Sequence, residues 1–211
     1  MRLILASTSP SRRAVLEAAH IVHEVLPSTV NEDAVLARAE LEAATRRAEL
    51  DLPAKVSVLA RAKALDVAER VRGDGPVAVL GCDSLFELDG KALGKPHTRA
   101  RARKRLAAMS ERTGTLHTGH CLVVIDGERR IFEEPRASSV VVAKLTPAEI
   151  DAYVATGEPL AVAGSFTLEG YGGPFIERIE GDHHNVLGLS LPALRSLLAQ
   201  AGTDITELWA S

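Results

Sequence analysis

The sequence predicts a mixed α/β fold, in which helices pack on a twisted sheet of parallel and antiparallel strands. Short apolar runs bounded by glycine, proline or serine alternate along the chain with longer segments of helical periodicity. Two turns, Asp89-Gly90 and Asp126-Gly127, are typical of hairpins, which join antiparallel strands. A purely parallel sheet is therefore not expected. The 211 residues suffice for one domain with a substantial core, or for one domain divided into two lobes.

Strands and helices alternate in the first half of the chain. Ser9 and Pro10 suit the start of a helix after the first strand, and Pro53 separates two later helices. The second of those helices carries an apolar stripe, and the apolar run after it is bounded by glycine and proline. In chain order we expect strand 2–6, helix 11–19, strand 22–26, a loop over 27–32, helices 33–50 and 54–72, and strand 77–82.

Capping signals mark the helices of the second half. Thr98 suits the start of a basic helix, and Thr146 and Glu149 form a capping box around a proline. Gly157 ends that helix, and Ser190 caps the last one. In chain order we expect helix 98–109, strands 117–125 and 130–142, helix 146–155, a glycine-rich loop over 164–173, strand 175–179 and a helix ending near 201. We expect residues 1–211 to form a single domain.

Composition excludes several classes of protein. Apolar residues make up 46% and charged residues 25%, which is ordinary for a globular protein. The net charge of −3 and an aromatic content of 3% argue against a nucleic-acid partner. No apolar run approaches the ~18–20 residues that span a bilayer. Cys82 and Cys121 form no CxxC pair, so we expect two reduced core thiols in a cytoplasmic protein.

Three polar features in the first half are candidates for chemistry. The segment from Ser7 to Arg13 joins a strand to a helix, and its hydroxyls, helix-start amides and arginines favour a phosphate. A capped helix with surface arginines is the more ordinary alternative. Glu32 lies in a polar loop, where a solvated acid is the commoner outcome. Lys63 lies within an apolar stripe, so its ammonium either extends to solvent or points into a cleft.

Three further candidates follow in chain order. Asp83 comes at the exit of strand 77–82, where an acid faces the ligand crevice of an α/β sheet and can bind a metal or activate water; a turn aspartate is the alternative. Lys95, between Gly94 and Pro96, suits a fixed cation that meets a phosphate, or a plain polar turn. Glu169 lies among four glycines, which permit close approach of a ligand or make a flexible surface loop.

Other clusters are expected to be structural. The basic run over 99–105 is typical of a solvated helix face. His183-His184 lies in a turn, and no third ligand is spaced with the pair for a metal. A triad of Ser7, His117 and Asp83 lacks the G-x-S-x-G elbow that would support it.

A series of motifs runs in one order from residue 3 to about 198. The stretches are LILASTSPSRRAVL, STVNED, LARAKA, VLGCDS with LGKP, RTGTLHTGHCLVV, YVATGEP, and AGSFTLEGYGG through IEGDHHNVLGLSLPALRSLL. In these motifs the chain resembles the Maf family of nucleoside triphosphate pyrophosphatases, also called septum formation proteins.

The resemblance implies two lobes around a central cleft and hydrolysis of a nucleoside triphosphate to the monophosphate and diphosphate. It implies a divalent cation, Mg²⁺ or Mn²⁺, with Glu32 and Asp83 as its ligands. The residues matched to catalysis are Asp83, Lys63 and Lys95, and those matched to substrate binding are Ser7, Arg12, Ser84 and Glu169.

Several positions depart from the members that prefer dTTP and UTP. Ser11, Ser84 and Glu169 replace the arginine, threonine and glutamine of those members. The stretch AGSFxxEG is more similar to the branch that acts on 7-methyl-GTP and some pyrimidine triphosphates, although that branch's tryptophan at position 11 is absent. An ionised glutamate only accepts hydrogen bonds, so Glu169 favours guanine or cytosine, which offer donors. We therefore expect 7-methyl-GTP or CTP to be a better substrate than dTTP.

The expected partner is a nucleoside triphosphate substrate. We expect neither a stable complex with nucleic acid nor binding to a membrane, and the chain can be a monomer or a homodimer. The resemblance links the activity to clearance of modified nucleotides and to arrest of cell division. Two alternatives remain. A non-enzymatic, nucleotide- or protein-binding regulator of septum formation would tolerate loss of the acid–lysine set. A different phosphohydrolase would release one phosphate at a time.

Overall fold

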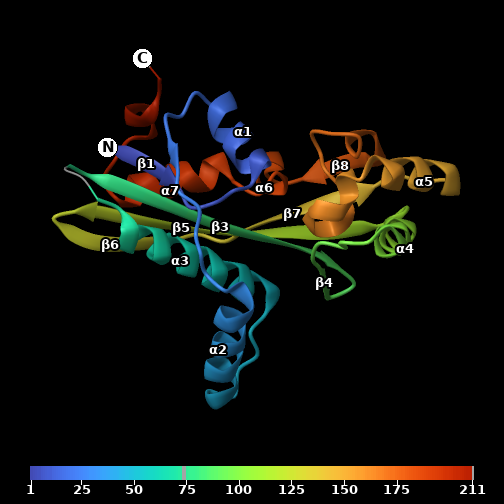
Figure 1. The fold of residues 1–211 in the computed structure, drawn as a ribbon, viewed down its shortest axis with the longest axis horizontal. Helices are drawn as coiled ribbons and strands as arrows, with labels where there is room; N and C mark the ends of the chain where they lie inside the picture. Colours follow the sequence, from blue (N-terminus) through green and yellow to red (C-terminus); the bar gives the residue numbers. More distant parts are fainter. Residues whose placement is uncertain (73–74, 211) are drawn as a thin grey trace. The chain divides into compact units, whose positions relative to one another are not determined.

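The computed structural model describes residues 1–72 and 75–210, and within them it confirms the mixed α/β fold class (Figure 1). The eight-stranded sheet has the strand order β2-β1-β3-β5-β7-β8, with β4 paired to β3 and β6 paired to β5. The chain divides into two compact units, in agreement with the expected two lobes. The first unit holds residues 1–83, 118–136 and 188–211, and the second holds 84–117 and 137–187. The cleft and the single domain stay predictions.

The first unit combines parallel strands with helices. Strand β1 pairs in parallel with β2 and with β3, and β6 pairs antiparallel with β5. Strands β3 and β5 each have one part in this unit and one in the other. Its elements are β1 (Arg2–Leu5), α1 (Pro10–Ala18), β2 (Glu24–Val25), α2 (Glu32–Thr45), α3 (Leu52–Arg70), the start of β3 (Val77–Leu88), the end of β5 (Thr113–Asp126), β6 (Glu128–Glu133), α7 (Leu191–Gln200) and the 3₁₀ turn η4 (Ile205–Leu208).

Helix α3 lies directly on the sheet of the first unit. A Cβ atom added at Gly81 would lie 2.2 Å from the carbonyl oxygen of Ala60, and one added at Gly119 would lie 2.3 Å from that of Val56. Both glycines are therefore required by close approach of the helix backbone. The apolar stripe of α3, predicted from its periodicity, is buried in the core of this unit. This close packing fixes which residues of α3 face β3.

The second unit has its own core. Helices α4 and α5 pack against each other, and the Phe86 and Phe166 rings meet edge to face with centroids 5.4 Å apart. The predicted hairpin turn is present, since Asp89 and Gly90 have φ of 53° and 73°. The elements of this unit are the end of β3, β4 (Lys91–Leu93), α4 (Arg99–Met109), the start of β5, β7 (Arg136–Val142), α5 (Pro147–Thr156), the 3₁₀ turns η1 (Glu158–Ala161), η2 (Ala163–Ser165) and η3 (Gly173–Phe175), β8 (Ile176–Glu180) and α6 (His183–Val186).

The predicted end of the third strand at residue 82 was wrong. Strand β3 continues to Leu88, so Asp83 lies inside a strand and not at its exit. The polar residue does not end the strand because its carboxylate is paired with a lysine, and the later half of the strand still has β4 as a partner. Asp83 is consequently held by strand geometry on both sides.

Two other boundaries differ from the prediction. The expected strand 130–142 is two strands, β6 and β7, which flank Pro135; proline has no N–H to donate to a ladder. Helix α2 begins at Glu32, capped by Asn31, where a loop was expected, and it ends at Thr45 because Arg47 adopts a positive φ of 55°. No helix among the described residues is both long and apolar enough to cross a bilayer. Cys82 and Cys121 are buried and unpaired, as predicted for core thiols.

Candidate functional site

Three predicted site residues meet in the first unit. The Lys63 Nζ lies 2.6 Å from Asp83 Oδ1 and 2.7 Å from Glu32 Oε1. Asp83 is 7% exposed and the Lys63 side chain 12%, while Glu32 is exposed. A single ammonium therefore joins a buried carboxylate to one that reaches solvent.

The sheet and α3 place Asp83 and Lys63 opposite each other. Gly81 and Asp83 are two residues apart on β3, so both face the same side of the sheet. Gly81 contacts α3 at Ala60 and Ala64, which flank Lys63 on that helix. Of the two outcomes considered for Lys63, the structure shows the ammonium turned toward an acid, not extended to open solvent.

Asp66 holds the loop that leads to Glu32. Its carboxylate accepts hydrogen bonds from the backbone N and the Oγ1 of Thr29, at 2.9 and 3.2 Å. Burial alone would raise the pKa of Asp66, but the bonds from Thr29, Ser28 and Arg70 outweigh burial and lower it. Asp66 was not predicted from the sequence; its spacing of three residues from Lys63, on the same helix face, was the available signal.

Burial and charge act in opposite directions on Asp83. Burial is the largest influence and raises the pKa of its carboxyl group; the Lys63 and Arg12 cations oppose it, and the net pKa is above the ordinary value. A carboxylate with a raised pKa is a better proton acceptor than a solvated one. Asp83 thus has the electrostatic setting of a general base.

The donor set of Asp83 and Glu32 fits a hard divalent cation. Both groups are carboxylates, the ligand type preferred by Mg²⁺. Both contact the same position, which the Lys63 ammonium occupies. A point bounded by two carboxylates attracts positive charge. The described residues therefore fit the cation that the resemblance implies, with Asp83 and Glu32 as the holders.

Ser7 and Arg12 organise the turn between β1 and α1. The Arg12 side chain, 9% exposed, donates from Nε to the Gly188 carbonyl at 2.7 Å, and from Nη1 to Ser7 Oγ at 3.1 Å and to the Cys82 carbonyl at 2.9 Å. Ser9 caps α1, as predicted. Arg12 therefore ties the turn to the residue that precedes Asp83.

A pocket opens beside this turn. Its lining includes Ser7, Ser9 and Arg13, together with Glu17, which pairs with Arg13 at 2.6 Å. The buried Arg12 is not among the lining residues. Arg13, which follows the predicted Arg12, is the arginine that lines this pocket.

Lys95 lies in the second unit, in the loop between β4 and α4, and it is exposed. Arg105 of α4 donates to the Gly94 carbonyl, and the His97 amide donates to the Leu160 carbonyl at 3.2 Å, so the loop is tied on both sides of Lys95. The basic residues of the run over 99–105 are exposed as expected except Arg105, which is half-buried. Burial, the main influence, lowers its pKa, and the neighbouring Arg101 lowers it further.

Glu169 is exposed in the glycine-rich loop, and the Glu158 carboxylate holds that loop by hydrogen bonds. The Glu158 carboxylate accepts from the Tyr171 and Gly172 amides at 2.9 and 3.0 Å and from the Thr167 hydroxyl. It also accepts from the Tyr153 hydroxyl at 2.9 Å. These bonds fall on both sides of Glu169, so the loop is not the freely flexible alternative.

Hydrogen bonding also sets the charge state of Glu158. Burial by itself would raise the pKa of Glu158, but the bonds from Thr167, Tyr171, Tyr153 and Gly172 outweigh it and hold the pKa below its ordinary value. Glu158 was not predicted from the sequence. Its position directly after Gly157, at the end of a capped helix, was the only local signal.

The structure therefore brings together Asp83, Lys63 and Glu32, and it joins Ser7 to Arg12 in the same unit. Ser84 is half-buried in β3 and, like Lys95 and Glu169, belongs to the second unit. The catalytic and binding roles of all these residues stay predictions.

Comparison with known proteins decides the family. A family profile described as "Maf-like protein" matches residues 2–201. The chain belongs to the Maf family. The resemblance seen in the motifs is confirmed over nearly the whole length.

Two curated relatives share about half of their residues with this Maf protein. One from Salinispora tropica is 49% identical over 211 residues, which cover 99% of this chain and 88% of the relative. One from Streptomyces coelicolor is 50% identical over 210 residues, covering 99% and 95%. Both are named nucleoside triphosphate pyrophosphatase.

A solved structure matches more weakly. It is the nucleoside-triphosphatase, or dITP/XTP pyrophosphatase, of Mycobacterium abscessus, 14% identical, covering 96% of this chain and 97% of its own, with a TM-score of 0.35. A similarity at this level supports no inference about this chain.

Proposed function

We propose that this Maf protein hydrolyses a nucleoside triphosphate to the monophosphate and diphosphate. The observation that carries the proposal is the buried Asp83 carboxylate paired with Lys63, which also reaches Glu32. The names of relatives about 50% identical to this chain agree with it.

In the proposed reaction, the oxygen of a water molecule forms a bond to the α-phosphorus. The bond between that phosphorus and the oxygen that bridges to the β-phosphorus breaks, and diphosphate leaves with the electron pair. Asp83 orients the water and accepts its proton, for which its raised pKa suits it. Lys63 keeps the Asp83 and Glu32 carboxylates in place until substrate arrives, because it contacts both.

Asp83 and Glu32 would hold a divalent cation, Mg²⁺ or Mn²⁺. When bound, such a cation supplies positive charge next to the phosphate oxygens and lowers the pKa of coordinated water. The remaining positive charges come from the protein. Lys63, Lys95 and Arg12 offset the charge that develops on the phosphates and on the departing diphosphate.

Base selection is assigned to the glycine-rich loop. Ser7 and Ser84 contribute hydroxyls to substrate binding, and Glu169 accepts hydrogen bonds from the base. An acceptor-only carboxylate favours the donors of guanine and cytosine, and a positively charged 7-methylguanine favours it further. We therefore propose 7-methyl-GTP or CTP as better substrates than dTTP.

A cytoplasmic setting is proposed with this reaction, and the unpaired, buried thiols of Cys82 and Cys121 support it. Removal of modified nucleotides and a link to arrest of cell division are proposed with it, and the chain works as a monomer or a homodimer.

A turnover screen tests the proposal. Purified protein is incubated with Mg²⁺ or Mn²⁺ and each of 7-methyl-GTP, GTP, CTP, UTP and dTTP, and the products are separated. Monophosphate and diphosphate in equal amounts are expected. Release of orthophosphate would identify a stepwise phosphohydrolase, and binding without turnover of any triphosphate would identify a non-enzymatic regulator.

A further inference from the structure

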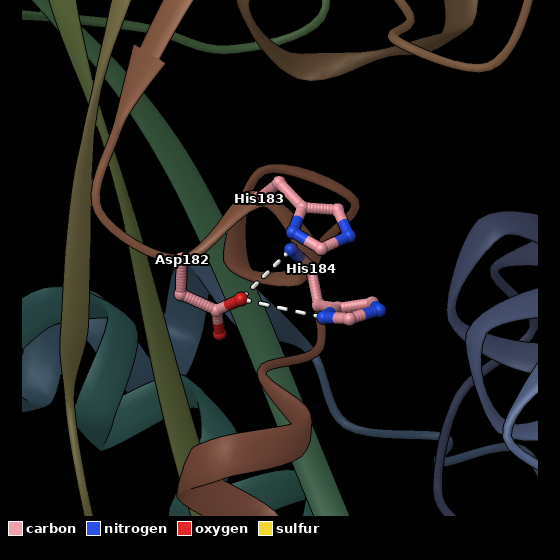
Figure 2. Close-up of side chains that lie close together, drawn as sticks. All are labelled: Asp182, His183 and His184. Carbon is pink, nitrogen blue, oxygen red and sulfur yellow. Dashed lines mark hydrogen bonds and ion pairs between the residues drawn. The ribbon is translucent and has the colours of Figure 1, made fainter.

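Three metal-ligating side chains gather where β8 ends and α6 begins. Asp182, His183 and His184 each offer one ligand atom, and these atoms lie within 4.8 Å of one another. Figure 2 shows the carboxylate and the two imidazole rings on the same side of the turn. The expectation that the histidine pair has no third ligand was wrong, because Asp182 precedes it directly and turns back over the start of α6.

The turn itself is held by buried polar contacts. Ser138 Oγ donates to the Asp182 carbonyl at 2.8 Å, and Asn185 Nδ2 donates to Ser138 Oγ at 3.1 Å and to the Leu116 carbonyl at 3.0 Å. Asn185 is fully buried. The backbone that presents the three donors is therefore fixed before any ligand arrives, which lowers the entropic cost of binding.

The contacts within the cluster leave coordination capacity. Asp182 Oδ1 accepts from the His184 amide at 2.9 Å and lies 3.4 Å from His184 Nδ1. Asp182 Oδ2 is buried and has no hydrogen-bond partner in the described part of the chain. The His183 and His184 rings lie 3.8 Å apart between centroids, and His183 is exposed. Helix capping accounts for Oδ1 but not for the orphaned Oδ2 or for the approach of two imidazoles.

We propose that Asp182, His183 and His184 bind a divalent transition metal such as Zn²⁺. Two imidazoles and one carboxylate are the donor set of sites that hold zinc with one open position. Ligand atoms around a tetrahedral zinc lie about 3.4 Å apart at zinc–ligand distances of ~2.0–2.1 Å, so a rotation of the exposed His183 ring completes the site. Imidazole nitrogen selects this class of metal over Mg²⁺, which prefers the all-carboxylate pair of Asp83 and Glu32. The site and the proposed hydrolysis are independent of each other.

Zinc titration of the whole protein by calorimetry tests the site. Millimolar Mg²⁺ is kept present so that it occupies Asp83 and Glu32, and zinc binding to these two carboxylates does not contribute to the signal. One Zn²⁺ per chain is expected for the parent protein. His183→Gln and His184→Gln should each weaken binding by at least about tenfold. His20→Asn removes an exposed histidine from the first unit and should leave the affinity unchanged.

Asp182→Asn separates ligation from helix capping. Asparagine caps helices as well as aspartate does, so α6 keeps its cap while the negative charge is lost. The melting temperature without zinc should stay near that of the parent, and the zinc-induced rise in melting temperature should shrink. Co²⁺ in place of Zn²⁺ should give a visible absorption band that the three variants lose. Absence of zinc binding in the parent, or equal affinity in all variants, would overturn the site.

Discussion

Asp83 in the first unit is buried and Glu158 in the second is half-buried, and their surroundings drive the pKa values of the two carboxylates in opposite directions. Asp83 is buried next to a lysine, and burial dominates and raises its pKa. Glu158 is surrounded by hydroxyl and amide donors, which outweigh burial and lower its pKa. A carboxylate that keeps its proton affinity is suited to chemistry, and one saturated with hydrogen bonds is suited to holding a loop.

The largest expected effect comes from removing the first carboxylate. Asp83→Asn keeps the size of the side chain but removes the charge that a cation and an attacking water require. Loss of a general base costs about 10²–10⁴-fold in turnover, and loss of a metal ligand adds to it. Diphosphate release by purified protein measures the effect, with the exposed Asp126→Asn as a matched control. Turnover within a few-fold of the parent would remove Asp83 from catalysis.

The two lysines test the cationic side of the site. Lys63→Ala and Lys95→Ala should each lower turnover by about 10–10³-fold, because positive charge next to phosphates acts mainly in the transition state. The melting temperature should change little in Lys95→Ala, where the side chain is exposed, but it should fall in Lys63→Ala, because the buried Asp83 carboxylate loses its cation. Lys144→Ala, whose parent side chain is 78% exposed, is the control. Unchanged kcat and KM in both variants would remove Lys63 and Lys95 from catalysis.

Glu169 tests what the loop above Glu158 does. Glu169→Gln adds a donor, which pairs with uracil and thymine, so preference should move toward UTP and dTTP by tenfold or more, as about 1–3 kcal/mol for a mispaired polar group implies. Ratios of kcat/KM across the five triphosphates measure the shift. A parent that already prefers dTTP, or an unchanged ranking, would show that Glu169 does not select the base.

Glu158→Gln tests the structural carboxylate. The variant cannot accept all the bonds that Glu158 accepts, so it should lose about 1–3 kcal/mol of unfolding free energy and raise KM more than it lowers kcat. The exposed Glu177→Gln is its control. A loss of kcat as large as that of Asp83→Asn, with KM unchanged, would contradict the contrast between the two carboxylates.

The same residue predicts a pH dependence. Because the folded-state pKa of Glu158 is below its ordinary value of 4.5, its contribution to stability is fully present above that pH and is lost as the pH falls through the folded-state pKa. Denaturant unfolding from neutral pH to pH ~3 should therefore show a smaller acid-dependent loss in Glu158→Gln than in Glu177→Gln. Equal losses would remove Glu158 from the acid response.

The smallest expected signal comes from the thiols, whose pKa values are raised because burial outweighs the nearby cations. Burial raises the pKa of Cys82 to about 11 and that of Cys121 to about 12. Neither thiol should react with a thiol reagent at neutral pH until the protein unfolds. The absorbance change of the thiol reagent measures the rate of labelling. Rapid labelling of the native protein would show that residues around Asp83 are less buried than the structure indicates.

Local signals predicted most of the elements because the relevant forces act over a few residues. The caps at Ser9, Thr98 and Thr146 and the hairpin at Asp89-Gly90 all appear where their sequences indicate. The predictions that failed depend on contacts between residues that are far apart in the sequence. The third strand was expected to end with its apolar run at residue 82, but it continues through Asp83, whose buried carboxylate is paired with Lys63 twenty residues earlier.

By itself, the sequence determined the mixed α/β class, the helix starts, the Maf motifs and the residue types at the site. Tertiary structure decided how those residues are used. Only the packing of α3 on Gly81 brings Lys63 to Asp83. Only the folded turn between β1 and α1 shows that Arg12 is buried while Arg13 lines the pocket. Only the hydrogen bonds from the Tyr171 and Gly172 amides show that Glu158 holds the loop that carries Glu169. A carboxylate's role depends on which donors and cations surround it, and these come from distant segments that no local pattern places together.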